Sequence, residues 1–164
     1  MTAKNGVSLN WGGFDKAMGK AALKLGNTKS LMNSVGEALV SGTLQRFADE
    51  EDPQGQKWPK SGRAANEGGQ TLTDTGRLQK SIDYAATPDK VMVGSNLVYA
   101  RIHQKGGAIT PKKAKRLVFK GTGGRTVSAD KVTIPPRPFL GVSRADMEEV
   151  KETMADFLAG AFKP

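Results

Sequence analysis

The strongest constraint on the fold is a proline cluster near the carboxyl end of the chain. Residues 134–141 read Ile-Pro-Pro-Arg-Pro-Phe-Leu-Gly. Proline fixes its own φ, lacks an amide hydrogen and restricts the residue before it, so this stretch can be neither a helix nor an inner strand. It predicts a rigid connector that holds Phe139 in the core ahead of a final helix. Ser143 and Asp146 resemble a capping box for that helix, and Arg137, held between prolines, is a candidate contact residue.

Apolar spacing predicts two long helices, at residues 28–50 and 143–161. In both, apolar side chains recur every three or four positions and therefore share one helical face. They are Leu31, Val35, Leu39, Leu44 and Phe47 in the first helix, and Met147, Val150, Met154, Phe157, Leu158 and Ala161 in the second. Gly36 and Gly42 lie inside the first helix, where they predict close approach by another helix or strand.

The segments between the helices predict a small sheet and a ribbon. Runs at 82–86 and 90–94 flank a Thr-Pro-Asp turn, a pattern typical of a hairpin. A second ribbon is expected at 108–134, with the glycine-rich stretch 121–124 as its tip. We therefore expect an α+β fold. A small antiparallel sheet packs against two long helices, and a basic β-ribbon arm projects from them.

Other segments are expected to be short or irregular. Residues 51–71 form a polar loop whose one large apolar side chain, Trp58, is expected to dock on the core. Short helices are expected at 73–82 and 97–104.

The chain is expected to consist of one domain and an arm. Residues 1–27 are rich in Gly and Lys. Either a short helix forms at 16–25, or the segment is an arm that orders only against a partner. Trp11, followed by two glycines, suits an anchor on a flexible tether. Residues 28–164 are long enough for a single domain with a modest core.

Positive charge is concentrated in the middle of the chain. The formal net charge is +9. Residues 101–137 contain ten basic side chains and only one acidic side chain. Such a surplus attracts an acidic partner over a long range. The segment is either a solvated loop face or a surface that lies against DNA or an acidic neighbouring subunit.

An acidic run, Asp49-Glu50-Glu51-Asp52, ends the first helix. Acids at the negative end of a helix dipole are mildly unfavourable, so a basic partner nearby would help. We hypothesise that the basic ribbon of one subunit reaches an acidic surface on a neighbouring copy or on another protein. The candidate interface residues are Lys112, Lys113, Lys115, Arg116, Lys120, Arg125, Arg137, Asp49, Glu50, Glu51 and Trp11.

The residues that would support catalysis or metal binding are scarce. The chain has no cysteine and one histidine, His103, which is expected at a helix end. A zinc site or an activated nucleophile is therefore not supported. The stretch 121–125 lacks the Gly-Lys-Ser/Thr ending of a phosphate loop. We expect no enzyme activity, cofactor or metal. No apolar run is long enough to predict a membrane span or a secretory signal.

Several motifs resemble, in their order, the phage virion morphogenesis family, which includes tail-completion proteins of Mu-like and P2-like phages. Head–tail joining proteins of long-tailed phages are more distantly similar. The motifs are Phe47, Asp52-Pro-Gln-Gly55, Trp58-Pro59, Leu72-Thr-Asp-Thr-Gly-Arg-Leu78, Ser81-Ile82, Val91-Met-Val-Gly94, Val98-Tyr-Ala-Arg-Ile-His-Gln104 with Gly106, and Ile134-Pro-Pro-Arg-Pro-Phe-Leu-Gly141.

The resemblance implies a structural virion protein at the neck of a tailed phage, present in the host cytoplasm during assembly. It implies tail completion and head–tail joining as a ring, a hexamer by family resemblance, with tail tube, tail terminator and head connector proteins as partners. It implies no enzyme activity. The alternative function is that of a small basic protein that binds DNA non-specifically, through phosphate contacts alone.

Overall fold

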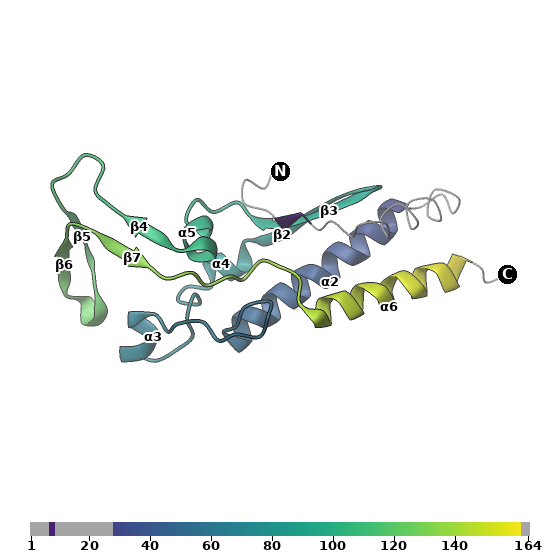
Figure 1. Cartoon of the computed structure of the whole chain (residues 1–164), viewed down its shortest axis with the longest axis horizontal. Coiled ribbons are helices and arrows are strands. Elements are labelled where there is room, and N and C mark those ends of the chain that lie inside the picture. Colours follow the sequence, from purple (N-terminus) through teal and green to yellow (C-terminus); the bar gives the residue numbers. More distant parts are fainter. Residues whose placement is uncertain (1–6, 9–27, 162–164) are drawn as a thin grey trace.

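Helix α2 is the element against which the small sheet and helix α6 both pack (Figure 1). The computed structural model describes residues 7–8 and 28–161. Its elements are β1 (Val7–Ser8), α2 (Thr28–Asp49), α3 (Gly62–Asn66), α4 (Arg77–Lys80), β2 (Ile82–Thr87), β3 (Lys90–Ser95), α5 (Ala100–Lys105), β4 (Gly107–Ile109), β5 (Leu117–Lys120), the 3₁₀ turn η1 (Thr122–Gly124), β6 (Thr126–Ala129), β7 (Val132–Ile134) and α6 (Arg144–Ala161). The expected α+β class is confirmed.

The core forms along the apolar stripe predicted for α2. Leu31, Val35 and Leu39 are buried, and α6 adds Val150 and Met154 to the same cluster. Strand β3 faces this cluster with alternate residues, because side chains along a strand point to opposite faces. Both long helices therefore lie where the sequence predicts them.

An aromatic cluster packs around the C-terminal end of α2. The ring of Phe47 packs edge-on to Trp58, with centroids 5.6 Å apart, and at a tilt to Phe139, with centroids 5.3 Å apart. The Trp58 Nε1–H also donates to the Pro138 carbonyl at 3.0 Å. The predictions that Trp58 docks on the core and that Phe139 enters it are confirmed, and this packing joins the polar loop to the connector.

Arg46 is a buried side chain of α2 that bonds to both the proline connector and α6. Its Nη1 lies 2.6 Å from Asp146 Oδ2, with both side chains at most 5% exposed. Its Nε donates to the Phe139 carbonyl at 3.0 Å, and Nη2 donates to Thr43 Oγ1 and to the Gly141 carbonyl. A buried charge is tolerated only when paired and hydrogen-bonded in this way.

The same carboxylate caps α6. The Ser143 amide donates to Asp146 Oδ2 at 2.7 Å, and the Asp146 amide donates to Ser143 Oγ at 3.0 Å. This reciprocal pair is the capping box expected from the sequence. Asp146 therefore starts the helix and also attaches it to Arg46.

Two glycines allow the close packing around α2. A Cβ at Gly36 would overlap the Tyr84 ring of β2, lying 2.7 Å from Cε2. A Cβ at Gly42 would overlap the carboxylate of Asp146. The expected close approach of a strand and of a helix is thus confirmed, one at each glycine.

The ribbon expected at 108–134 is present and is divided into two parts. Strand β4 pairs with β7, and β5 pairs with β6, as two separate antiparallel ladders. Residues 110–116 separate the ladders on one side, but only 130–131 separate them on the other. The unequal lengths prevent continuous pairing and bend the arm between its two halves.

Local structure between the long helices also differs from expectation. Helix α3 lies in the stretch 51–71, which was expected to be only a loop. The helix expected at 73–82 is a single turn, α4, because Ile82 pairs with Ser95 as the first residue of β2. The helix expected at 97–104 is shifted to α5, so Val98 precedes the helix, and it is 92% exposed.

Asp146→Ala should destabilise the fold by about 3–5 kcal/mol, because it leaves the Arg46 guanidinium buried without its counter-charge. Urea unfolding followed by circular dichroism measures the loss. Glu149→Ala, at an exposed position of the same helix, serves as the control and should change stability by no more than about 0.5 kcal/mol. Equal midpoints for the two variants would contradict the role of the ion pair.

Gly36→Ala should lower stability by about 1–3 kcal/mol, since the added methyl overlaps the Tyr84 ring and overpacking outweighs the gain in helix propensity. Gly160→Ala is the matched control, because its Cβ meets nothing within 4 Å. That change should stabilise the protein slightly. Thermal unfolding of both variants compares the two helical glycines directly, and a Gly36→Ala protein with a raised Tm would refute the close contact.

Candidate functional site

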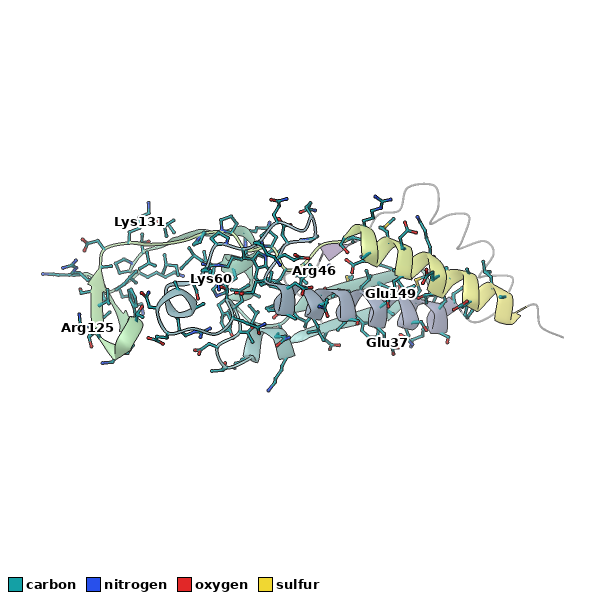
Figure 2. All side chains as sticks on the ribbon, turned by 90° about the horizontal axis from the view of Figure 1, so that it is seen from below. Glu37, Arg46, Lys60, Arg125, Lys131 and Glu149 are labelled. Carbon is teal, nitrogen blue, oxygen red and sulfur yellow. The ribbon has the colours of Figure 1, made fainter. Side chains whose placement is uncertain are left out.

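The arm formed by the two ladders extends away from the long helices (Figure 1). Figure 2 shows Arg125 and Lys131 at the arm end of the molecule, while Glu37 and Glu149 lie over the helices. The elongated fold thus separates a basic end from the helices.

Most basic side chains of the arm are exposed and unpaired. The described part of the chain offers no ion-pair partner to Lys112, Lys113, Lys115 or Arg125. Two other predicted interface residues are partly engaged. Arg116 Nε lies 3.0 Å from Asp130 Oδ1, and Lys120 Nζ donates to Thr126 Oγ1 at 2.9 Å. The arm therefore presents a strongly positive surface that few internal contacts neutralise.

The arm also exposes apolar side chains, which the charge pattern did not reveal. Val118 is 68% exposed and Phe119 is 40% exposed. Phe119 and Val127 are direct partners across the β5–β6 ladder, so their side chains share one face. A two-stranded ribbon has little surface to bury them against and is only marginally stable alone. Exposed apolar groups beside cations are typical of a surface that contacts another protein.

One hydrogen bond attaches the tip of the arm to the rest of the molecule. The Gly123 amide donates to Glu67 Oε1 at 2.6 Å. Glu67 directly follows α3, and Gly123 lies in the η1 turn between β5 and β6. Helix α3, absent from the sequence-based expectation, therefore positions the arm.

The acidic run at the end of α2 is largely engaged within the chain. Glu50, which has a positive φ of 55°, accepts a hydrogen bond from the Thr71 amide at 2.5 Å. This backbone hydrogen bond lowers the pKa of the Glu50 carboxyl below its usual value of 4.5, with Lys60 and Lys57 contributing. Glu51 pairs with Lys57 at 3.1 Å. The basic partners that the sequence called for at this helix end lie in the following loop.

Asp49 is the most available acid of this run. Its side chain is exposed and accepts a hydrogen bond from Gln45 Nε2 at 3.0 Å. A contact of Asp49, Glu50 and Glu51 with a partner remains a prediction. Trp11, the candidate anchor of the N-terminal arm, lies outside the described residues.

Arg137 is positioned differently from the arm residues. Only 5% of it is exposed, and its Nε donates to the Pro59 carbonyl at 2.7 Å. Its amide donates to the His103 carbonyl at 2.7 Å, so the connector is tied to the end of α5. The sequence suggested a contact residue on a rigid connector. The rigidity is evident, but the side chain lies in the floor of a hollow and not on an open face.

Gln104 adds a second tie between α5 and the connector. Its Oε1 accepts hydrogen bonds from the Phe139 and Leu140 amides, and its Nε2 donates to the Leu140 carbonyl at 2.8 Å. The prolines of the connector lack amide hydrogens and prevent regular backbone pairing there, so side chains satisfy the backbone groups that remain. The motif that ends α5 thus serves to hold the connector.

The described ranges, 7–8 and 28–161, bring together no group of three or more His, Cys, Asp or Glu side chains that could hold a metal ion. Among these residues no helix combines the length and apolar character needed to cross a bilayer.

Comparison with known proteins identifies the family of this fold. The model of the phage virion morphogenesis family matches residues 9–159. The chain belongs to this family. The match spans the α2 core, the arm and nearly all of α6. The features described above therefore lie in the region that the family shares.

Two curated relatives agree with this assignment. The chain is 29% identical over 135 residues to the "Putative capsid assembly protein G" of Escherichia phage Mu, covering 77% of this chain and 76% of that protein. It is 31% identical over 141 residues to the "Mu-like prophage FluMu G protein 2" of Haemophilus influenzae, covering 86% of each. No solved structure gives a significant match. The chain is thus a phage virion morphogenesis protein.

Glu50→Gln should lower stability by about 1 kcal/mol at neutral pH, because an amide oxygen is a weaker acceptor for the Thr71 amide than a carboxylate. The folded pKa of Glu50 is depressed, so its contribution is fully present above about 4.5 and is lost as pH falls through the folded pKa. Urea unfolding between pH 7 and pH 2 should show the two proteins converging in acid. Glu51→Gln is the control. A difference that persists at low pH would contradict the assignment.

Proposed function

We propose that this chain is a structural virion protein, without enzyme activity, that acts in tail completion and head–tail joining at the neck of a tailed phage. The observation that carries the proposal is the family match across the core and the arm. The printed name of the Mu relative, a capsid assembly protein, agrees with a role in particle assembly. The proposed partners are other copies of the chain, tail tube or tail terminator proteins, and head connector proteins.

A ring is the assembly that best fits the shape and charge of the molecule. Rings form when one heterologous contact repeats until it closes. The arm is basic, while α6 exposes Glu149, Glu152 and Asp156, whose carboxylates have no partner within the described residues. Their spacing of three and four places these acids on one helical face. We propose that the arm of one copy contacts this acidic face on the next, in a ring that family resemblance suggests is a hexamer.

The α6 face extends the acidic surface hypothesised from the sequence. Glu50 and Glu51 are used within the chain, so fewer of their oxygens remain for a neighbour. The α6 acids carry no such internal ties. Electrostatic attraction between the arm and α6 would guide the copies together, and the apolar pair Phe119 and Val127 would strengthen the contact once it forms.

A charge swap tests this contact. The arm variant Lys112→Glu, Lys113→Glu, Lys115→Glu and the helix variant Glu149→Lys, Glu152→Lys, Asp156→Lys should each fail to self-associate. An equimolar mixture should associate, because each reversed surface then meets its complement. Analytical ultracentrifugation at low salt measures the outcome. Arg116 is left unchanged to preserve its pair with Asp130. Association of either variant alone to the wild-type extent would contradict the proposed contact.

The same arm variant tests the role in the particle. Phage lacking the wild-type protein and supplied with the arm variant should yield filled heads and unattached tails. The control Lys29→Glu, Lys80→Glu, Lys90→Glu reverses three exposed lysines outside the arm and should support normal particles. Electron microscopy of lysates and plaque counts give the readout, and infectious particles from the arm variant at wild-type yield would overturn its role in joining.

Non-specific DNA binding is the second candidate function, favoured by exposed cations of the arm that have no ion-pair partner within the described residues, among them Lys112, Lys113, Lys115 and Arg125. It would give duplex affinity that falls steeply with salt, because binding releases counterions. The exposed Val118 and Phe119 favour a protein partner instead. A duplex titration at two salt concentrations separates the candidates, since the neck proposal requires no affinity for DNA in the free chain.

A further inference from the structure

A hollow of about 400 Å³, open to solvent, lies between the loop before α4, helix α5 and the proline connector. It is distinct from the arm and from the α6 face. Its charged, aromatic and imidazole lining consists of Arg63, Asp74, Arg77, Tyr99, His103 and Arg137.

Arg137 in this hollow has no acidic partner among the described residues. Its Nε is used by the Pro59 carbonyl, and its Nη groups make no hydrogen bond within the part of the chain that the structure describes. Burial lowers the pKa of the guanidinium from its usual value. The Arg137 residue as a whole is only 5% exposed. Burying a guanidinium without a counter-charge is energetically costly, and such groups are normally paired.

The other charges of the hollow do not supply that partner. Asp74 lies 3.5 Å from Arg63 Nε, so the single carboxylate of the lining is already paired. Arg77 is exposed and has no ion-pair partner within residues 28–161. The hollow therefore carries a surplus of positive charge around an unpaired guanidinium.

His103 adds an unused polar atom to the same lining. Its Nδ1 is buried without a hydrogen-bond partner. Burial and the nearby Arg137 lower the pKa of the imidazole, which keeps the ring neutral at neutral pH. A neutral imidazole carries its proton on either ring nitrogen. Because Nδ1 is buried in this structure, it donates to an incoming oxygen only after the ring rotates toward the hollow. Buried atoms that lack partners are rare and indicate a missing group.

Apolar side chains stand at the edge of the hollow. Tyr99 lines it and is 37% exposed, and its ring packs edge-on to His103 at 6.1 Å. Its chain neighbour Val98 is 92% exposed. An exposed valine and tyrosine beside a cationic floor suit a polypeptide that supplies both an acid and an apolar neighbour.

We propose that this hollow binds a carboxylate side chain of a neighbouring polypeptide, with Arg137 as the principal ligand and His103 and Arg77 as supporting contacts. The planar fork of a guanidinium matches the two oxygens of a carboxylate. Arg137 is recessed, so a slender side chain reaches it, whereas a DNA duplex meets cations that project, like those of the arm. This inference rests on the proposed function in one respect only, namely that the neighbouring polypeptide is another virion subunit.

His103 provides a clean probe, because it is the single histidine of the chain. We would titrate the full-length protein with acetyl-Leu-Asp-Leu-amide and follow the His103 ring signals by nuclear magnetic resonance. The peptide should shift these signals and raise the His103 pKa, because a carboxylate stabilises the imidazolium. Acetyl-Leu-Asn-Leu-amide is the matched neutral peptide and should produce little change.

Substitutions assign the binding residues. Arg137→Gln should weaken peptide binding by about tenfold or more, whereas Arg144→Gln, at an exposed arginine outside the hollow, should leave it unchanged. Arg137 also holds Pro59, so Arg77→Gln gives a second test at an exposed position and should weaken binding about threefold.

Three results would overturn the proposal. They are an unresponsive His103, an equal response to the asparagine peptide, or a response to inorganic phosphate but not to the aspartate peptide. The last result would assign the hollow to a phosphate-bearing partner. Since the titration uses the isolated chain, its failure is separate from any failure of ring formation or tail joining.

Discussion

The fold depends on one buried guanidinium. Arg46 reaches from α2 to the carboxylate that starts α6 and to two carbonyls of the proline connector. Apolar stripes hold helices together but tolerate sliding, whereas this set of directional bonds is satisfied at a single register. The pair with Asp146 therefore fixes where α6 lies along α2. It also fixes the point where the connector leaves the core toward the arm.

Patterns of closely spaced residues correctly predicted the features that depend only on residues near in the sequence. The helical stripes, the capping box and the rigidity of the proline connector all follow from short-range spacing, and the structure has them. The partner of Asp146 did not follow, because Arg46 is 100 positions away and the contact arises only when the helices pack. Helix α3 also escaped prediction, since its five residues, Gly-Arg-Ala-Ala-Asn, carry no apolar periodicity.

Part of the candidate site was predictable and part was not. The sequence located the positive segment, because charge is a property of composition. It could not show that Arg137 is recessed while Lys112 and Lys113 project, since burial depends on the surrounding loop and on α5. Nor did it show that Phe119 and Val127 meet across a ladder, which requires the register of two strands separated by a turn.

The bond between Gly123 and Glu67 has a consequence for the timing of assembly. A hydrogen bond to an exposed carboxylate contributes only about 1 kcal/mol in water, so replacing this bond by a contact with a partner costs little free energy. In the ring proposed above, an arriving subunit would therefore lose little free energy when its arm changes partner. In the same proposal this bond would also reduce premature pairing in solution, because it holds the tip of the arm at Glu67, next to α3.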